Sequence, residues 1–438
     1  MTRADGAVVI RGARWPGDIL VVDGRVAAVG DVGDLAGIPV LDASGGLVTA
    51  GLVNTHHHLF QRVTRGRAVG CDLLGWLRHL LPVWSRLTPE DMATAARLAL
   101  CELALAGVST TVDHHFVVPG GNDGVMHAIA DAAGTVGLRL VLARGVIDLG
   151  PDRGGFVPDS LTEDPEAAMA SVEALADSMG GLRAGGPDVT VAVAPSSLFA
   201  VSRELLRAAA ELARRKGLRL HLHLSESAAE EGYCLERFGR RPVELLDELG
   251  WLDQPLWVAH AIHLRPQDRE RLGGAGVGVA HCPGSNARLA SGICPVSRLQ
   301  EAGCAVGLGC DGAAANDAGG LLGQARLALQ LARLSEGRAG AMLPAGALAL
   351  ATTGGAACLG RPELGRLEVG APADLAVWPG ADIEDFPDPV DGLVLGPDRL
   401  VLHLLVGGRP VVVDGRLPGV DLEALRRDVT VRSQRIGA

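Results

Sequence analysis

The chain has 438 residues and a formal net charge of −11, with 48 % hydrophobic and 21 % charged residues. This composition is typical of a globular protein with a large core and excludes an extensively disordered chain. The negative charge argues against binding to nucleic acid or to an anionic membrane surface as a primary task.

Targeting and redox signals are few. The chain has no uninterrupted apolar stretch of about 20 residues, so we expect no membrane span. MTRADGAVVI lacks the basic and long apolar segments of a signal peptide, so we expect a cytoplasmic protein. The eight cysteines are scattered and form no Cys-x-x-Cys pair, which favours reduced thiols over disulfides or a Cys-rich zinc site.

Residues 1–50 have the pattern of short strands. AVVIRGA, DILVVDGRVAAVG and IPVLDASGGLV carry the branched apolar residues of strands and are interrupted by Gly and Asp. We expect this segment to form part of a small β-domain.

Residues 51–364 alternate short apolar runs with longer helical patterns. The predicted strands span 51–58, 109–115, 139–147, 189–196, 218–226, 255–262, 276–283 and 304–312. Thr88 and Ser202 are the expected N-caps of two of the intervening helices. Strands that alternate with helices pair in parallel, and eight such units predict an α/β fold of the (β/α)8 TIM-type barrel class. No G-x-G-x-x-G follows the first strand, which disfavours a nucleotide-binding open sheet.

Residues 365–438 resemble the N-terminal segment in pattern. GRLEVGAPADLAVWPG and LVLHLLVGGRPVVVDGRL are again strand-like runs broken by Gly, Pro and Asp. We therefore expect residues 1–50 and 365–438, the latter with a tail, to build one composite β-sandwich beside the barrel.

Polar residues stand at or near the predicted C-terminal strand ends. Because all barrel strands end at one mouth, residues far apart in sequence converge there. These residues are His56, His58, His223, Glu226, His260, His281 and Asp311. Side chains alternate along a strand, so His56 and His58 share a face while His57 points away.

Four imidazoles and one carboxylate suit a borderline metal ion. We predict one divalent ion per subunit, Zn²⁺ with Fe²⁺ as the alternative, held by His56, His58, His223, His260 and Asp311. Glu226 and His281 remain as acid–base or hydrogen-bonding groups. Such an ion lowers the pKa of a bound water towards about 7.

Four residues are candidates for contacts with a substrate. Gln61, three residues beyond His58, can form hydrogen bonds with the amide edge of a ring, and Trp84 can form a pocket wall. His114 and His115 end the second strand; one can face the pocket, and we take His115 as the candidate. Arg144, near the end of the third strand, can meet a ring carbonyl or form a salt bridge.

Lysine is nearly absent. Of the 40 basic residues only Lys216 is lysine, and it lies at the end of a helical pattern. A Schiff base or a carbamylated lysine bridging two metals on a strand therefore has almost no place in this chain.

Several segments together resemble the amidohydrolase superfamily over essentially the whole chain. They are GLVNTHHH with its His-x-His, HLSE with its His-x-x-Glu, VAHAIHL, HCPGSNARLASGICPV and GLGCDGAAAND. Within it the chain is most similar to the mononuclear deaminase branch, in the group of 8-oxoguanine deaminases and hydroxydechloroatrazine ethylaminohydrolases. NTHHHLFQRVTRG, LLGWLRHLLPVWSRLTPE, VDHHFVVPGG and GGFVPDSLTED carry that similarity.

The resemblance implies hydrolytic deamination of a heterocycle, with 8-oxoguanine converted to urate and ammonia as the main hypothesis. In this mechanism Asp311 takes a proton from the attacking water and passes it to the leaving amine. Glu226 protonates the adjacent ring nitrogen, and His281 hydrogen-bonds the attacking oxygen or a ring carbonyl. A homo-oligomer, dimeric or larger, is also expected.

Alternatives remain open. In APSSLFAVS, Ser196 and Leu198 stand where relatives tend to have Cys and Pro, which bears on the pocket wall and on the substrate. An s-triazine aminohydrolase or chlorohydrolase, or a guanine or isoguanine deaminase, would use the same residues. A different class, an inactive amidohydrolase-like binding protein, would be expected to have lost some of them.

Overall fold

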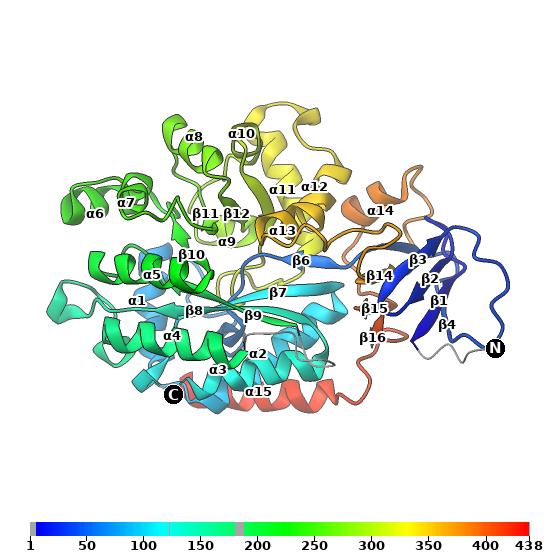
Figure 1. The fold of residues 1–438 in the computed structure, drawn as a ribbon, viewed down its shortest axis with the longest axis horizontal. Helices are drawn as coiled ribbons and strands as arrows, with labels where there is room; N and C mark the ends of the chain where they lie inside the picture. Colours follow the sequence, from blue (N-terminus) through cyan, green and yellow to red (C-terminus); the bar gives the residue numbers. More distant parts are fainter. Residues whose placement is uncertain (1–5, 122, 180–187, 438) are drawn as a thin grey trace.

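The computed structural model describes residues 6–121, 123–179 and 188–437. At its centre, eight parallel strands lie side by side in chain order (Figure 1). The strands are β6 (Leu52–Asn54), β7 (Val108–His115), β8 (Arg139–Val146), β9 (Val189–Pro195), β10 (Arg219–Leu224), β11 (Leu256–His260), β12 (Gly278–His281) and β13 (Ala305–Leu308).

Hydrogen bonds just beyond the first strand close this sheet into a barrel. The backbone N–H of Thr55 donates to the carbonyl O of Leu308 at 2.9 Å. The N–H of Cys310 donates to Asn54 Oδ1 at 2.9 Å. The predicted (β/α)8 class is therefore confirmed.

Helices follow the strands and cover the barrel on its outside (Figure 1). They are α1 (Leu73–Trp84), α2 (Pro89–Leu105), α3 (Gly124–Val136), α4 (Pro165–Met179), α5 (Arg203–Lys216), α6 (Ala228–Phe238), α7 (Pro242–Glu248), α8 (Pro266–Gly274), α9 (Pro283–Arg288), α10 (Val296–Ala302), α11 (Leu321–Glu336), α12 (Pro344–Leu350), α13 (Thr353–Cys358), α14 (Pro389–Leu395) and α15 (Leu422–Gly437). Thr88 and Ser202 cap α2 and α5 as expected, because their hydroxyls accept the N–H groups of Asp91 and Leu205.

Short apolar side chains fill the barrel interior. One buried cluster takes residues from six of the eight strands, among them the alternate residues Val141 and Ala143 from β8 and Ala192 and Ala194 from β9. The intervening residues face the helices, as the two-residue period of a strand requires.

Strands from both ends of the chain form two further sheets beside the barrel (Figure 1). The N-terminal sheet contains β1 (Ala7–Arg11), β2 (Ile19–Val22), β3 (Arg25–Val29) and β4 (Val40–Asp42). The second sheet contains β5 (Leu47–Ala50), β14 (Leu375–Trp378), β15 (His403–Val406) and β16 (Arg409–Val412). One apolar cluster joins the two sheets, with Ile10 and Ile19 from the first and Val48, Val377 and Leu405 from the second. This is the composite β-sandwich expected from the sequence.

Several barrel strands end earlier than predicted. β6 ends at Asn54 and β10 at Leu224, so His56–His58 and Glu226 lie beyond the strands. Their backbone bonds still cross the mouth, since the carbonyl O of His56 accepts the N–H of Asp311 at 3.0 Å. The functional side chains are thus carried by turns that the barrel holds at both ends.

The C-terminal tail is helical. Helix α15 returns to α2, where Arg432 pairs with Asp91 at 2.9 Å and with Glu90 at 2.7 Å. Across the described ranges, none of the helices combines the length and apolar character needed to cross a bilayer.

Candidate active site and metal centre

A cavity opens where the barrel strands end. Its empty volume is about 650 Å³, including the part open to solvent, and side chains such as Trp76, Phe116, Phe156 and Phe199 form its apolar wall. The polar side chains that reach it are His58, Gln61, Ser196, Ser197, His223, Glu226, Glu230, His260 and Asp311. A concave, mostly apolar site with a few convergent polar groups is the usual form of a small-molecule site.

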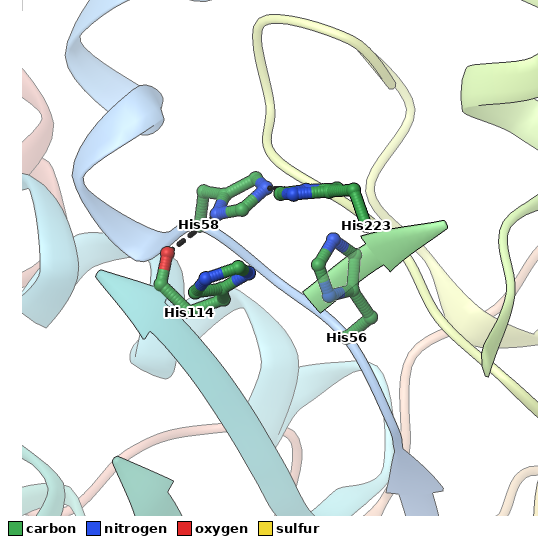
Figure 2. Close-up of side chains that lie close together, drawn as sticks. All are labelled: His56, His58, His114 and His223. Carbon is green, nitrogen blue, oxygen red and sulfur yellow. Dashed lines mark hydrogen bonds between the residues drawn. The ribbon is translucent and has the colours of Figure 1, made fainter. Parts of the chain in front are cut away.

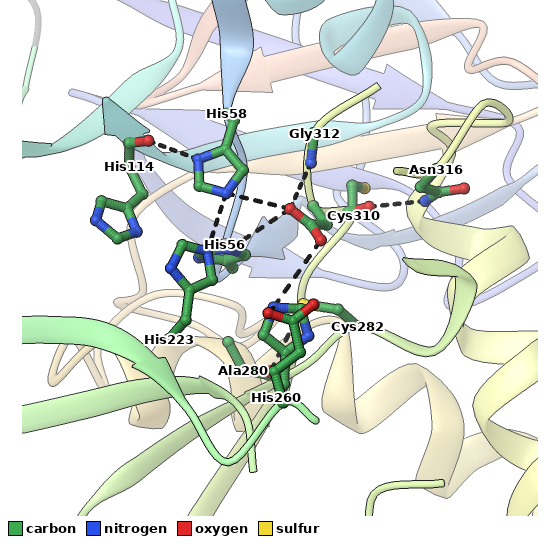
Figure 3. A network of polar contacts seen from close by, with 12 residues as sticks. His56, His58, His114, His223, His260, Ala280, Cys282, Cys310, Gly312 and Asn316 are labelled. Carbon is green, nitrogen blue, oxygen red and sulfur yellow. Dashed lines mark hydrogen bonds and ion pairs between the residues drawn. The ribbon is translucent and has the colours of Figure 1, made fainter. Parts of the chain in front are cut away.

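Potential metal ligands lie together at the barrel mouth in two overlapping groups, which are His56, His58, His114 and His223, and His56, His260 and Asp311. Figure 3 shows the five histidines of these groups close to one another. Asp311 Oδ1 lies 3.3 Å from His58 Nε2 and 3.6 Å from His56 Nε2, and its Oδ2 lies 3.9 Å from His260 Nε2. The Nε2 atoms of His58 and His223 are 3.1 Å apart. The five residues predicted from separate strand ends are therefore together.

The other ring nitrogen of each histidine is held by a partner outside this group. The pairs are His58 Nδ1 with the His114 carbonyl O at 2.6 Å (Figure 2), His223 Nδ1 with the Ser196 carbonyl O at 2.7 Å, His260 Nδ1 with Asn286 Oδ1 at 2.9 Å, and His56 Nδ1 with His221 Nε2 at 2.9 Å. A carbonyl oxygen can only accept, so Nδ1 of His58, His223 and His260 carries the hydrogen and Nε2 keeps its lone pair. His221 Nδ1 donates to the carbonyl O of Trp257 at 3.0 Å, so the neutral His221 accepts at Nε2 and His56 Nδ1 carries the hydrogen as well. This is the tautomer that a metal ligand needs.

The group fits a divalent ion. In the described part of the chain, the buried Nε2 atoms of His56 and His260 have no hydrogen-bond partner. Burial lowers the pKa of His58 to about 3 and that of His56 well below its usual value, so both imidazoles are neutral. Burial opposes the ionisation of Asp311, but a hydrogen bond with His56 and positive charge beside the carboxyl outweigh burial and hold its pKa well below the usual range. Neutral imidazoles with one ionised carboxylate are the protonation states that metal binding requires.

Strained backbone turns the site residues towards the cavity. Ser225, His260 and Asp311 have φ angles of 50°, 71° and 59°, in the left-handed region that non-glycine residues rarely adopt. Such conformations interrupt the alternation of a strand and are concentrated at functional sites.

Glu226 is the second carboxyl of the cavity. Its Oε2 lies 3.7 Å from His260 Nε2, and only 6 % of the residue is exposed. Burial raises the pKa of Glu226 to about 8, so its protonated form dominates at neutral pH. It can therefore donate a proton where Asp311 can accept one.

Gln61 reaches the cavity with a free amide. The side chain is fully buried in the 3₁₀ turn Leu59–Thr64, and neither its oxygen nor its nitrogen has a hydrogen-bond partner among the described residues. A Cβ atom at Gly312 would overlap the amide oxygen, so this glycine makes room for Gln61. Gln61 thus offers one donor and one acceptor to a bound ring.

The structure does not bring Trp84 or His115 to the cavity wall. Trp84 Nε1 donates to Thr64 Oγ1 at 3.1 Å, and its ring packs against Phe60. His115 Nε2 bonds the carbonyl O of Val117 at 3.0 Å, and its Nδ1 lies 3.4 Å from Asp113 Oδ2. Both side chains lie behind the wall, so they support the site from outside it.

Arg144 also lies outside the cavity. Its guanidinium is fully buried and pairs with Glu163 at 2.6 Å and with Asp123 at 3.0 Å. Because Ala143 faces the barrel interior, Arg144 faces the helices. Of the two expectations for Arg144, a contact with a ring carbonyl and a salt bridge, the structure shows the salt bridge.

We expect Arg144→Met to lower the free energy of unfolding by about 3–5 kcal/mol, because it leaves the mostly buried carboxylate of Glu163 without its arginine partner. Activity per folded molecule should change little. Arg203→Met, which removes an arginine from a more exposed pair with Glu248, is the control and should cost about 1 kcal/mol or less. Urea unfolding and steady-state kinetics test both; a raised KM with unchanged stability would instead make Arg144 a substrate contact.

His281 is buried behind the cavity. Its pKa is lowered to about 3 by burial, with a further effect of His260, and its Nδ1 has no partner within the described ranges. It is not among the residues that line the cavity. Its proposed hydrogen bond to the attacking oxygen stays a prediction.

The site contains residues that sequence reasoning did not assign. His114, and not His115, faces the group: its ring stacks on His223 at 4.8 Å. The sequence could have indicated His114, because side chains two residues apart on a strand point to the same face. Val112, on the same strand, faces the barrel interior, so His114 does as well. Glu230 and Trp76 come from helices that follow the strands, and their spacing carried no comparable signal.

The chain is similar to known proteins along most of its length. Residues 47–411 match the amidohydrolase family. An 8-oxoguanine deaminase from Pseudomonas aeruginosa is 43 % identical over 416 residues, covering 93 % of this chain and 92 % of the relative. A hydroxydechloroatrazine ethylaminohydrolase from Pseudomonas sp. strain ADP is 32 % identical over 94 % of this chain and 89 % of the relative.

A solved structure has the same fold. The atrazine chlorohydrolase of Arthrobacter aurescens TC1, complexed with zinc, superposes with a TM-score of 0.91 at 30 % identity, covering 97 % of this chain and 100 % of that chain. The similarity therefore includes both the barrel and the flanking sheets. On the family match and on these relatives, the chain belongs to the amidohydrolase family.

Proposed function

We propose that the protein catalyses the hydrolytic deamination of a purine-like heterocycle, with 8-oxoguanine converted to urate and ammonia. The observation that carries this proposal is one cavity with an ionised carboxylate, Asp311, and a carboxyl kept protonated by burial, Glu226. Addition of water to an amino-bearing ring carbon needs both a base and an acid. The similarity to the deaminase from Pseudomonas aeruginosa supports the choice of 8-oxoguanine.

The proposal includes one divalent ion per subunit, Zn²⁺ with Fe²⁺ as the alternative. The donors that would hold it are His56, His58, His223, His260 and Asp311. When bound, the ion lowers the pKa of a water towards about 7 and so makes a nucleophile available near neutral pH. Zinc in the related atrazine chlorohydrolase supports the choice of metal.

Two carboxyls of the chain move the protons. Asp311 accepts a proton as water adds to the ring carbon, and Glu226 gives its proton to the adjacent ring nitrogen, so no charge builds up on the ring. In the second step the bond from carbon to the amino group breaks, and Asp311 protonates the leaving amine to give ammonia. The proton of the added hydroxyl returns to Glu226, which restores both groups and leaves a ring carbonyl.

The cavity wall suits a flat, neutral ring. Aromatic side chains, among them Trp76 and Phe116, provide apolar surfaces for its faces. Gln61 can bond an amide edge through its free donor and acceptor. No arginine or lysine lines the cavity in the described part of the chain, which disfavours a charged phosphate on the substrate.

The s-triazines are the second candidate substrates. The ethylaminohydrolase and the chlorohydrolase among the relatives act, by their names, on triazine compounds. The same acid and base serve an amine or a halide leaving group, and guanine or isoguanine would also fit this chemistry.

Three further features belong to the same proposal. We infer a homo-oligomeric protein of the cytoplasm, divided into a barrel of residues 51–364 and a β-domain of residues 1–50 and 365–438. The eight cysteines are all unpaired, and seven are buried, which suits a reducing compartment.

An ammonia-release assay over 8-oxoguanine, guanine, isoguanine, aminotriazines and a chlorotriazine tests the function. Ammonia should appear with 8-oxoguanine at the highest kcat/KM. Chloride release from the chlorotriazine, without ammonia from any purine, would favour the second candidate. No turnover of any compound by metal-loaded protein would contradict the proposal.

The pH dependence follows from Glu226. Since burial raises its pKa to about 8, the protonated acid is present below that pH and is lost above it, so kcat should fall as the pH rises. A bound cation favours the carboxylate and moves this fall to lower pH. A profile of kcat against pH checks this; no fall at alkaline pH would contradict the role of Glu226 as the acid.

A further inference from the structure

A second buried carboxyl lies next to Glu226. Glu230, in the first turn of α6, is 1 % exposed and lines the cavity. Its Oε1 accepts the N–H of Ser225 at 2.9 Å, and its Oε2 accepts the N–H of Glu226 at 3.4 Å. Among the described residues, it forms no ion pair with a basic side chain. Burial raises the pKa of Glu230 to about 8, whereas the two backbone N–H groups favour its ionised form. The carboxyl group of Glu230 is thus engaged by the backbone that carries Glu226.

Helix α6, which carries Glu230, has no hydrogen bond from its N-cap side chain to its first backbone N–H groups. Ser227 stands at the N-cap of α6, but its hydroxyl accepts no backbone N–H and has no partner in the described ranges. Glutamate in a first helical turn commonly reaches back to the N-cap backbone. Here Glu230 reaches further back, to the turn between β10 and α6.

That turn is strained and needs external support. Ser225 has a φ of 50°, a conformation that costs free energy for a non-glycine residue. Its carbonyl O accepts the N–H groups of Ile262 and His263, both at 3.0 Å, from the loop after β11. Glu230 holds the N–H side of the same residue, so Ser225 is fixed on both sides.

The direction of the Glu226 side chain depends on this turn. No hydrogen bond from the described residues fixes its carboxyl, and His260 Nε2 at 3.7 Å is beyond hydrogen-bond distance. The backbone conformation at Ser225 and Glu226 is therefore what aims the acid into the cavity.

We propose that Glu230 is a positioning residue: by accepting the N–H groups of Ser225 and Glu226, it holds the turn that presents Glu226 to the ring nitrogen of the substrate. The inference rests on the proposed role of Glu226 in deamination. It assigns a function to a carboxyl that takes no part in the proton transfers.

Glu230→Gln keeps the shape of the side chain but turns one of its two acceptors into a donor that faces an N–H group. We expect kcat to fall about 10²-fold, the effect of a misplaced catalytic group. KM and metal content should change little. Glu230→Asp, shorter by one methylene, replaces the Gln variant if that variant does not fold, with the same expected direction.

A double variant separates positioning from general damage. If Glu230 acts through Glu226, Glu226→Gln combined with Glu230→Gln should be no slower than Glu226→Gln alone. Additive losses would overturn the inference. Glu244→Gln is the control, since Glu244 in the first turn of α7 also accepts a backbone N–H, that of Arg241 at 3.2 Å, and does not line the cavity. Glu244 additionally pairs with Arg265 at 2.8 Å. A loss of kcat in Glu244→Gln equal to that of Glu230→Gln would also overturn the inference.

Hydrogen exchange gives a readout that does not depend on activity. In Glu230→Gln the amides of Ser225 and Glu226 should exchange faster, while amides in the strands keep their protection. Unchanged exchange at both amides would overturn the inference even if kcat falls. If the wild-type protein releases ammonia from no heterocycle, the proposed function fails, and the exchange of these two amides still decides whether Glu230 holds the turn.

Discussion

Replacing Glu226 with glutamine should lower kcat for ammonia release by about 10²–10⁴-fold, the usual contribution of a positioned proton donor. A glutamine amide has nearly the same shape but no proton of suitable acidity to give to a ring nitrogen. Since burial already disfavours the charged form of Glu226, a neutral amide at this position should not destabilise the fold. Metal content and thermal stability should therefore stay close to wild type.

The control for this variant is Glu236→Gln, a change on α6, the helix that follows the turn with Glu226. Glu236 is exposed on α6 and lies outside the cavity, so its variant should have wild-type kinetics. Steady-state kinetics, metal analysis and thermal unfolding of both proteins make the comparison. Near wild-type turnover by Glu226→Gln would refute the assignment of Glu226 as the acid.

Replacing Asp311 with asparagine should have the second large effect. Asp311 contacts His56, His58 and His260, so the variant removes both the proton acceptor and the only carboxylate of the predicted metal group. We expect kcat to fall at least about 10²–10⁴-fold and the metal content to fall with it.

Asp317→Asn provides the comparison. Asp317 lies in the same loop after β13, is partly exposed and pairs with Arg288 at 2.7 Å, away from the metal group. It should keep both activity and metal. An Asp311→Asn protein that retained metal and wild-type turnover would show that the group at the barrel mouth is not the reaction centre.

Much of the fold could be predicted from the sequence because barrel strands leave a strong pattern. The apolar runs from 109–115 to 304–312 located seven strands, and the isolated polar residues at their ends located the mouth. Bounds at that end were less accurate. His56 and Glu226 lie on turns just beyond β6 and β10, and the sequence pattern does not mark where these strands end. The backbone of His56 still bonds that of Asp311, so pairing continues past the end of the strand.

Errors of side-chain direction had one physical origin. His115 and Arg144 lie near strand ends, as pocket residues do, but the alternation of side chains along a strand places both on the helix side of β7 and β8. Val112 and Val141 are interior residues, so His114 and Ala143 face inward and their neighbours face outward. Applying parity from the small apolar residues of each strand would have selected His114.

Other parts of the site depend on packing that a linear pattern does not encode. Trp76 reaches the cavity from α1, and Phe156 and Phe199 reach it from loops. Glu230 looks in sequence like an ordinary helix acid, and its contacts with Ser225 and Glu226 exist only because the first turn of α6 lies against the turn that follows β10. Left-handed φ angles at Ser225, His260 and Asp311 likewise come from the assembled mouth.

The most direct test of the account is a zinc titration of metal-free protein with 8-oxoguanine as substrate, in which urate formation is followed by its ultraviolet absorbance. With one metal group per chain, activity should rise from background with added zinc and saturate at one ion per chain. Saturation only at two ions per chain, or turnover that is independent of metal, would contradict the single metal group of His56, His58, His223, His260 and Asp311.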